Sequence, residues 1–178
     1  MRNQLTFKIS VFGENNVGKS SLIQAITHKD FNKERRPPAI IDIETKYLTI
    51  DSYRVVLQIW ILRFDFQYDF LFPIFLKGSS GAIFMYDITK FSSINNVEKW
   101  IMTIRTNLCK ERNRIPIIMV GGKCDLYSSR TVPEKYAEKV ANKYKFFNYF
   151  ECSSKTGENI DKLFKFLTLG IMNFDGYI

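Results

Sequence analysis

The most chemically specific stretch of the chain is "GENNVGKS", residues 13–20. It fits the pattern G-x-x-x-x-G-K-[ST] and lies between an apolar stretch rich in β-formers and an amphipathic stretch, which is the context a phosphate loop requires. Its glycines let the backbone N–H groups from Asn15 to Lys19 surround phosphate oxygens, helped by the positive end of the following helix. Lys19 would reach the terminal phosphates, and the Ser20 hydroxyl would bind Mg²⁺. The predicted phosphate-binding residues are Gly13, Asn15, Asn16, Val17, Gly18, Lys19, Ser20 and Ser21.

The elements that position this loop follow from the apolar pattern. We expect strands at 5–12, 46–50, 53–60, 81–88, 115–121 and 146–154, and helices at 19–28, 92–110, 132–144 and 159–172. A hairpin turns at Asp51-Ser52, the serines at 92–93 suit a helix N-cap, and Pro133 suits a first helical turn. Strands alternating with helices predict an α/β fold with a mainly parallel six-stranded sheet and helices on both faces. Loops at the C-terminal ends of the strands then carry the site.

Composition limits the class of protein. The 178 residues suit one domain, 1–178, and a hydrophobic fraction of 46% with 25% charged residues excludes a disordered chain. No apolar run is long enough to span a membrane, and no signal peptide is visible. Three cysteines without metal-ligand spacing indicate reduced thiols in the cytoplasm. The net charge of +8 comes from dispersed basic residues, so a soluble basic surface is favoured over a nucleic-acid site.

Six motifs in combination resemble the small GTPases of the Ras superfamily, and most closely the Rab branch. They are "GENNVGKS", "LQIW", "GAIFMYDIT", "FSSINNVEKW", "IIMVGGKCDL" and "ECSSKTGENI", and together they cover nearly the whole chain. The resemblance implies the small G-domain form of the P-loop NTPase fold, with GTP or GDP as ligand and Mg²⁺ as its metal ion.

The resemblance also places a guanine pocket. The family's Asn-Lys-x-Asp motif corresponds to Gly122-Lys123-Cys124-Asp125. Asp125 would accept from the guanine ring N–H and exocyclic amine, which adenine cannot offer, and the stem of Lys123 would lie along the base. Gly122 removes the hydrogen bonds of the family's Asn, an expected cost of about 1–3 kcal/mol for an unreplaced buried polar contact. The resemblance further assigns Ser154, Lys155 and Phe31 to this pocket.

The family's hydrolysis and sensing groups are replaced in an ungapped comparison. The switch threonine that binds Mg²⁺ becomes Pro38, which has neither hydroxyl nor N–H. The Asp-x-x-Gly that follows the third strand becomes Ile61-Leu62-Arg63-Phe64, and the glutamine that positions water becomes Asp65. We therefore expect no catalytic residue, Ser20 as the one metal ligand, and weakly held Mg²⁺. Groups that could substitute by moving are Asp65, Asp69, Glu44, Arg35 and Arg36.

Aromatic residues recur at every second position from 64 to 72, the spacing of one strand face. Three interpretations remain open. The third strand could continue past Trp60 as fixed structure, a helix could expose some of the rings to a partner, or the rings could fill a cleft left by lost nucleotide contacts.

These observations predict a Rab-like GTP-binding protein with impaired or absent hydrolysis, acting through a protein effector or regulator at residues 31–77 in trafficking or signalling. The alternatives are a pseudo-GTPase scaffold that works without nucleotide exchange and a GTPase completed by a partner in trans. We expect a cytoplasmic protein that reaches membranes through partners. The ending "MNFDGYI" has no prenylation cysteines.

Overall fold

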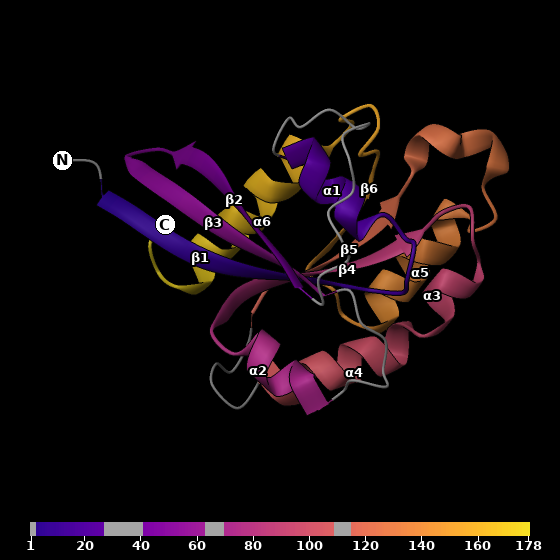
Figure 1. Ribbon diagram of the computed structural model, residues 1–178, viewed down its shortest axis with the longest axis horizontal. Coiled ribbons are helices and arrows are strands. Elements are labelled where there is room, and N and C mark those ends of the chain that lie inside the picture. The colour runs from indigo at the N-terminus through magenta and orange to yellow at the C-terminus, as the bar shows by residue number, and fades with distance from the viewer. Residues whose placement is uncertain (1–2, 27–40, 63–69, 109–114) are drawn as a thin grey trace.

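A six-stranded sheet forms the centre of the molecule in the computed structural model, which describes residues 3–26, 41–62, 70–108 and 115–178 (Figure 1). The strands are β1 (Asn3–Phe12), β2 (Ile41–Ile50), β3 (Tyr53–Leu62), β4 (Ser79–Asp87), β5 (Ile117–Gly122) and β6 (Asn148–Cys152). Their order is β2-β3-β1-β4-β5-β6. Only the β2–β3 hairpin pair is antiparallel among these strands, and the other four pairs are parallel. The predicted mainly parallel sheet with one hairpin is confirmed.

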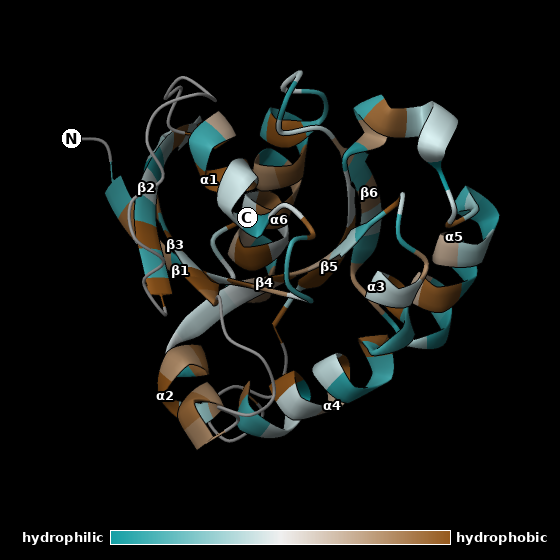
Figure 2. Ribbon diagram, turned by 45° about the vertical axis from the view of Figure 1, so that its right-hand side comes forward, coloured by the Kyte–Doolittle hydropathy of each residue, from teal (hydrophilic) through white to brown (hydrophobic). Residues whose placement is uncertain are grey.

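Helices cover both faces of the sheet, as predicted (Figure 1). Helices α1 (Lys19–Ile26) and α6 (Ile160–Phe174) lie on one face. Helices α2 (Phe72–Leu76), α3 (Ser92–Asn95), α4 (Val97–Leu108) and α5 (Glu134–Lys143) lie on the other, and a 3-10 turn, η2 (Cys124–Ser129), follows β5. Figure 2 shows hydrophobic colour through most of α2, whereas α4 and α5 mix hydrophobic and hydrophilic residues.

Two hydrophobic cores result from strand alternation. On β3, Leu57 and Ile59 point to the α1 and α6 side, while Leu62 points to the α2 and α4 side. All nine residues of β4 are buried, because helices cover both of its faces. The C-terminal ends of the parallel strands are thereby fixed at one edge of the sheet, where the predicted site residues lie.

Several predicted boundaries were wrong. The helix expected at 92–110 is split, because Asn96 leaves the helical conformation between α3 and α4. Its serines do not cap it: Ser93 Oγ instead accepts from the N–H of Asp87 at 2.9 Å. Pro133 is the extended residue before α5 and not part of its first turn. Strand β2 begins at Ile41, five residues earlier than predicted.

The aromatic stretch is helical where the structure describes it. β3 ends at Leu62, only two residues beyond the predicted end, and α2 begins at Phe72. Phe72 is fully buried and packs edge-on against Trp100, whereas Phe70 is 71% exposed. Residues 63–69 lie outside the described part of the chain, so the interpretations of the rings there stay predictions.

Candidate functional site

The loop between β1 and α1 has the backbone conformation that its glycines allow. Gly13 has a φ of +137°, and a Cβ there would lie 2.1 Å from the carbonyl oxygen of Met85 on β4. Gly18 has a φ of +108°, and Asn16 lies in the left-handed region at +64°. A side chain at Gly13 would force the loop away from the sheet. The sequence pattern therefore corresponds to a loop packed directly on β4, followed at once by the helix N-terminus at Lys19.

The loop lysine is held inside the curve of the loop. Lys19 is 5% exposed, and its Nζ donates to the carbonyl oxygens of Gly13 at 2.6 Å and Glu14 at 2.7 Å. Ser20 and Ser21 follow in the first turn of α1 and are partly exposed. A buried ammonium beside a helix N-terminus is a place where phosphate oxygens find positive charge and N–H donors together.

Glu14 is a loop residue to which the sequence motif assigns no role. Its carboxylate accepts from Asn96 Nδ2 at 2.9 Å and from Trp100 Nε1 at 3.1 Å, both near the start of α4. The motif treats this position as variable, so the sequence pattern carried no signal for it. Glu14 fixes the outer side of the phosphate loop to the helix layer.

The loop after β5 brings Lys123 and Asp125 to the same edge of the sheet. Lys123 lies in the left-handed region with a φ of +67°, and its Nζ donates to Asn16 O at 3.0 Å. The same ammonium forms an ion pair with Asp87 Oδ2 at the end of β4. The predicted phosphate and base segments are therefore in direct contact through a charged hydrogen bond.

Ser153 organises the second half of the predicted base pocket, although only its neighbours Ser154 and Lys155 were predicted. It is fully buried, and its Oγ donates to Asp125 Oδ1 at 2.7 Å. The same oxygen accepts from the backbone N–H groups of Lys155 at 3.2 Å and Thr156 at 3.1 Å. Asp125 is thus held in place by the loop after β6. In "ECSSK" two serines are adjacent, and sequence alone could not show which one turns inward.

Gly122 stands where the resemblance expects Asn. A Cβ at this position would lie 2.9 Å from Val17 O in the phosphate loop and 2.9 Å from the Met85 methyl group. The space of the missing side chain is therefore occupied, because the phosphate loop packs directly on the Gly122 backbone.

A polar chain lies behind the loops after β5 and β6, here called the base-side loops. Arg130 donates to both oxygens of Glu151, Tyr149 donates to Glu151 Oε1, and the hydroxyls of Tyr149 and Tyr86 are 2.9 Å apart. Burial alone would raise the pKa of Glu151, but the hydrogen bonds from Arg130 and Tyr149 outweigh it and lower that pKa. Burial also raises the pKa of Tyr86. This chain joins β4, β6 and the segment after η2, and so holds the end of β6, from which one base-side loop starts.

The end of β3 differs from the phosphate loop and the base-side loops. Ile61, which the resemblance aligns with the carboxylate behind Mg²⁺, is fully buried in the core formed with α1 and α6. The predicted residues Phe31, Pro38, Phe64 and Asp65, and the substitutes Arg35, Arg36 and Asp69, lie outside the described residues. Within the described ranges, no group of three His, Cys, Asp or Glu side chains is placed to hold a metal ion.

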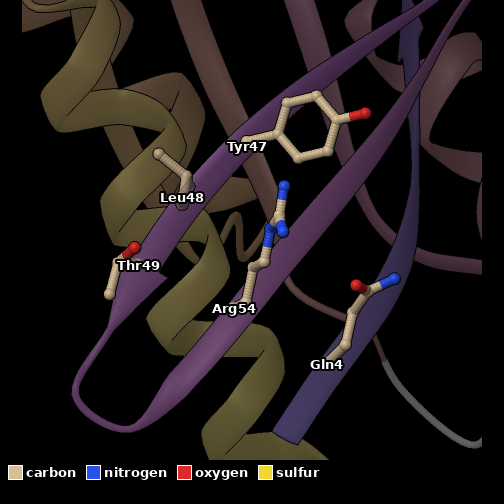
Figure 3. A pocket seen from close by; sticks show the side chains of 5 residues that line it. All are labelled: Gln4, Tyr47, Leu48, Thr49 and Arg54. Carbon is tan, nitrogen blue, oxygen red and sulfur yellow. The ribbon is translucent and has the colours of Figure 1, made fainter. Parts of the chain in front are cut away.

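Two exposed features lie away from the phosphate loop. Phe70 and Ile74 at α2 are 71% and 68% exposed, and Ile43 and Tyr47 are exposed on the edge strand β2. A shallow groove at the hairpin end is lined by Gln4, Tyr47, Leu48, Thr49 and Arg54 (Figure 3). This groove lies near the N-terminal end of β1, opposite the strand ends that carry the predicted site. None of the helices in the described ranges is long and apolar enough to cross a membrane.

Comparisons with known proteins agree with this arrangement. The profile of the Ras family matches residues 8–173. The chain is 29% identical over 166 residues to the Ras-related protein Rab-13 of Rattus norvegicus, covering 93% of this chain and 80% of that protein. It is 29% identical over 167 residues to the Ras-related protein Rab11A of Lotus japonicus, covering 94% and 72%. It is 30% identical over 159 residues to the GTP-binding protein ypt3 of Schizosaccharomyces pombe, covering 89% and 72%. With its phosphate loop and base-side loops meeting at one sheet edge, this chain belongs to the Ras family of small GTPases.

Proposed function

We propose that the chain works as one guanine-nucleotide-binding domain that binds GDP or GTP and hydrolyses GTP slowly or not at all. The observation that carries this proposal is the contact between its two recognition loops. Lys19 lies inside the phosphate loop, and Lys123 touches the same loop at Asn16 O from the base side. A nucleotide needs both groups at one edge, with phosphate and base within a single ligand's reach.

Guanine is the base that Asp125 favours. Its Oδ1 accepts from Ser153, which fixes the carboxylate. Its second oxygen accepts no hydrogen bond from the residues that the structure describes. An ionised carboxylate can accept hydrogen bonds but cannot donate them. It therefore recognises a base edge that donates, such as the N–H and amine of guanine. Adenine offers an unprotonated ring nitrogen there and is disfavoured.

Impaired hydrolysis is supported by the side of the site that faces β3. Ile61 is apolar and fully buried where a carboxylate behind Mg²⁺ would stand, so it offers no oxygen to the metal or to its water ligands. The substitutions at Pro38, Phe64 and Asp65 remove three further groups by the family comparison. Mg²⁺ would be held chiefly by Ser20 and by the nucleotide phosphates, and its binding would be weak.

Protein partners would recognise the surface of residues 31–77. Phe70, Ile74 and Ile43 are large apolar side chains exposed in its described part, and exposed apolar surface is typical of interaction sites. By family analogy the partners act in membrane trafficking or signalling, and the protein would reach membranes from the cytoplasm through them.

A scaffold that works without nucleotide exchange is the second candidate. Both site lysines are engaged by the protein itself, Lys19 by loop carbonyls and Lys123 by Asp87. A site whose cations are already satisfied can remain folded without ligand, so this observation favours the scaffold.

Nucleotide extracted from the purified chain and identified by ion-exchange chromatography separates the two candidates. GDP or GTP near one equivalent supports the proposal. Absence of nucleotide, together with no binding of added GDP in calorimetry, supports the scaffold. A GTPase completed by a partner in trans is tested by single-turnover hydrolysis with and without Mg²⁺. Clear Mg²⁺-dependent turnover by the isolated chain would contradict impaired hydrolysis.

A further inference from the structure

We propose that Asp87 is a positioning residue for nucleotide binding, acting through Lys123 on the phosphate loop. This inference rests on the proposed function, because it names a residue that supports the same site. None of the sequence motifs assigns Asp87 a role in binding. Its carboxylate lies at the C-terminal end of β4, between the phosphate loop and the base-side loop.

The carboxylate of Asp87 is buried and fully engaged. It is 4% exposed, and its Oδ1 accepts from the Thr89 N–H at 2.8 Å and the Thr89 hydroxyl at 2.7 Å. Its Oδ2 accepts from Lys123 Nζ at 2.5 Å. The two bonds from Thr89 fix the direction of the carboxylate, so that its second oxygen faces Lys123. A buried carboxylate of this kind demands a cation, which gives Lys123 one preferred position.

Lys123 carries this constraint to the phosphate loop. Its ammonium is shared between Asp87 Oδ2 and Asn16 O, and Asn16 stands at the left-handed turn of the loop. Without the carboxylate, a lysine that is about one-third exposed would exchange among solvent-facing rotamers. The path Asp87–Lys123–Asn16 therefore holds the Asn16 carbonyl toward Lys123 and fixes the left-handed turn of the phosphate loop.

Gly122 explains why this path matters in this chain. The family's Asn would link the base to the phosphate loop, but a Cβ at Gly122 would lie 2.9 Å from Val17 O. That position is closed by backbone, and the loop cannot move off without losing its packing on β4. The link between the two loops runs through Lys123 and Asp87 instead of through a side chain at Gly122.

The first test is a double-mutant cycle on release of a fluorescent GDP analogue, measured after adding excess GDP. Asp87→Asn keeps an acceptor for Thr89 and removes the charge facing Lys123, and we expect it to speed release about tenfold, the loss of a charge-assisted hydrogen bond. Lys123→Met keeps the stem and removes the ammonium. The double variant should release no faster than Lys123→Met alone, because Asp87 acts through Lys123. The proposal would be overturned if the two single effects on the release rate multiplied in the double variant, or if Asp87→Asn left the release rate unchanged.

Asp161→Asn is the matched control. Asp161 pairs with Lys46 on the surface, outside the Asp87–Lys123–Asn16 path, and its side chain is 85% exposed. It should leave release unchanged. A role of Asp87 in stability alone would lower the thermal midpoint of unfolding without coupling to Lys123 in the release rates, and that result counts against positioning.

The second test restores the family's side chain. We expect Gly122→Asn to release the analogue as fast as the parent or faster. Gly122→Ala should show the same release rate as Gly122→Asn, because a Cβ crowds Val17 O in both variants. If Gly122→Asn alone slowed release tenfold, position 122 would be open to a linking side chain. That result would overturn the inference that the phosphate loop closes this position.

Amide hydrogen exchange separates this inference from the proposed function. In protein stripped of nucleotide, Asp87→Asn and Lys123→Met should both speed exchange in residues 14–18, while Asp161→Asn should not. If the parent binds no guanine nucleotide, the proposed function fails, and faster exchange in these variants still supports the positioning path. Unchanged exchange in both variants overturns it.

Discussion

The neighbouring strands β1 and β3 differ in the kind of side chains and backbone groups found at their C-terminal ends. β1 and β3 are parallel and in register up to Val11 and Ile61, so the segments after them start at the same edge. After β1 comes a loop of left-handed turns that surrounds the Lys19 ammonium. At the end of β3, Ile61 and Leu62 are both buried in apolar cores. One strand end can stabilise negative charge, while the other, within its described residues, offers no polar side chain.

This difference separates binding from turnover. Holding a nucleotide needs donors and cations that match its ground-state charge, and in the proposed function the loops after β1, β5 and β6 supply them. Hydrolysis needs additional groups that act on the metal, the water and the γ-phosphate in the transition state. By the family resemblance, those groups would come from the segment at and after the end of β3 and from residues near 38. The comparison predicts retained binding with lost catalysis, and the following experiments test it.

Removing the loop cation should have the largest effect. We expect Lys19→Ala to weaken GDP binding about 100-fold, because a desolvated lysine contacting phosphate is worth roughly 3 kcal/mol. Calorimetric titration with GDP measures the change, and Lys135→Ala on the exposed side of α5 is the control. An affinity within twofold of the parent would show that the phosphate loop does not hold nucleotide.

Placing a carboxylate at the end of β3 should destabilise the protein. Ile61→Asp buries a charge without a partner, and we expect the free energy of unfolding to fall by about 3–5 kcal/mol. Urea unfolding measures it, with Ile61→Val as the apolar control, expected to cost about 1 kcal/mol. If Ile61→Asp keeps its stability and tightens Mg²⁺ binding, this strand end is open to a metal, and the contrast between the two strand ends fails.

Removing the buried hydroxyl of Ser153, in the loop after β6, should affect base recognition alone. Ser153→Ala removes the donor that fixes Asp125, and we expect GDP affinity to fall roughly five- to tenfold, one hydrogen bond's worth. Binding of inorganic pyrophosphate should stay within twofold, since the phosphate loop is untouched. Equal losses for both ligands would indicate that Ser153 only holds the fold together.

The smallest effect concerns acid stability. The pKa of Glu151 is lowered in the folded protein from its ordinary value of 4.5, so this group stabilises the fold above that value. As the pH falls below it, the unfolded chain binds the proton first, and the contribution is lost as the pH passes through the folded pKa. Glu151→Gln should therefore show a shallower loss of thermal midpoint between pH 6 and 3 than the parent. Parallel pH profiles for the two proteins would contradict the lowered pKa.

Much of the fold follows from local patterns. Strand β4 and the hairpin at Asp51 were predictable, since apolar runs and turn residues act within a few positions. The break at Asn96 was not, because Glu14 in a distant loop binds Asn96 and Trp100 there. In the site, the spacing of the phosphate-loop motif predicted Lys19, and the family resemblance predicted Lys123 and Asp125. Glu14, Asp87 and Ser153 were missed, because their partners come from other elements.

The sequence by itself determined which chemical groups this chain possesses at the ends of its strands. Residue type and local spacing predict a phosphate loop, and the family resemblance predicts a base-reading carboxylate and an isoleucine in place of a metal carboxylate. Only the tertiary structure decided how the groups are connected. Lys123 meets both Asp87 and Asn16, and Gly122 lies under Val17, because three parallel strands bring their C-terminal loops to one edge. Contacts between segments that lie 36 to 107 residues apart depend on packing, which local pattern does not encode.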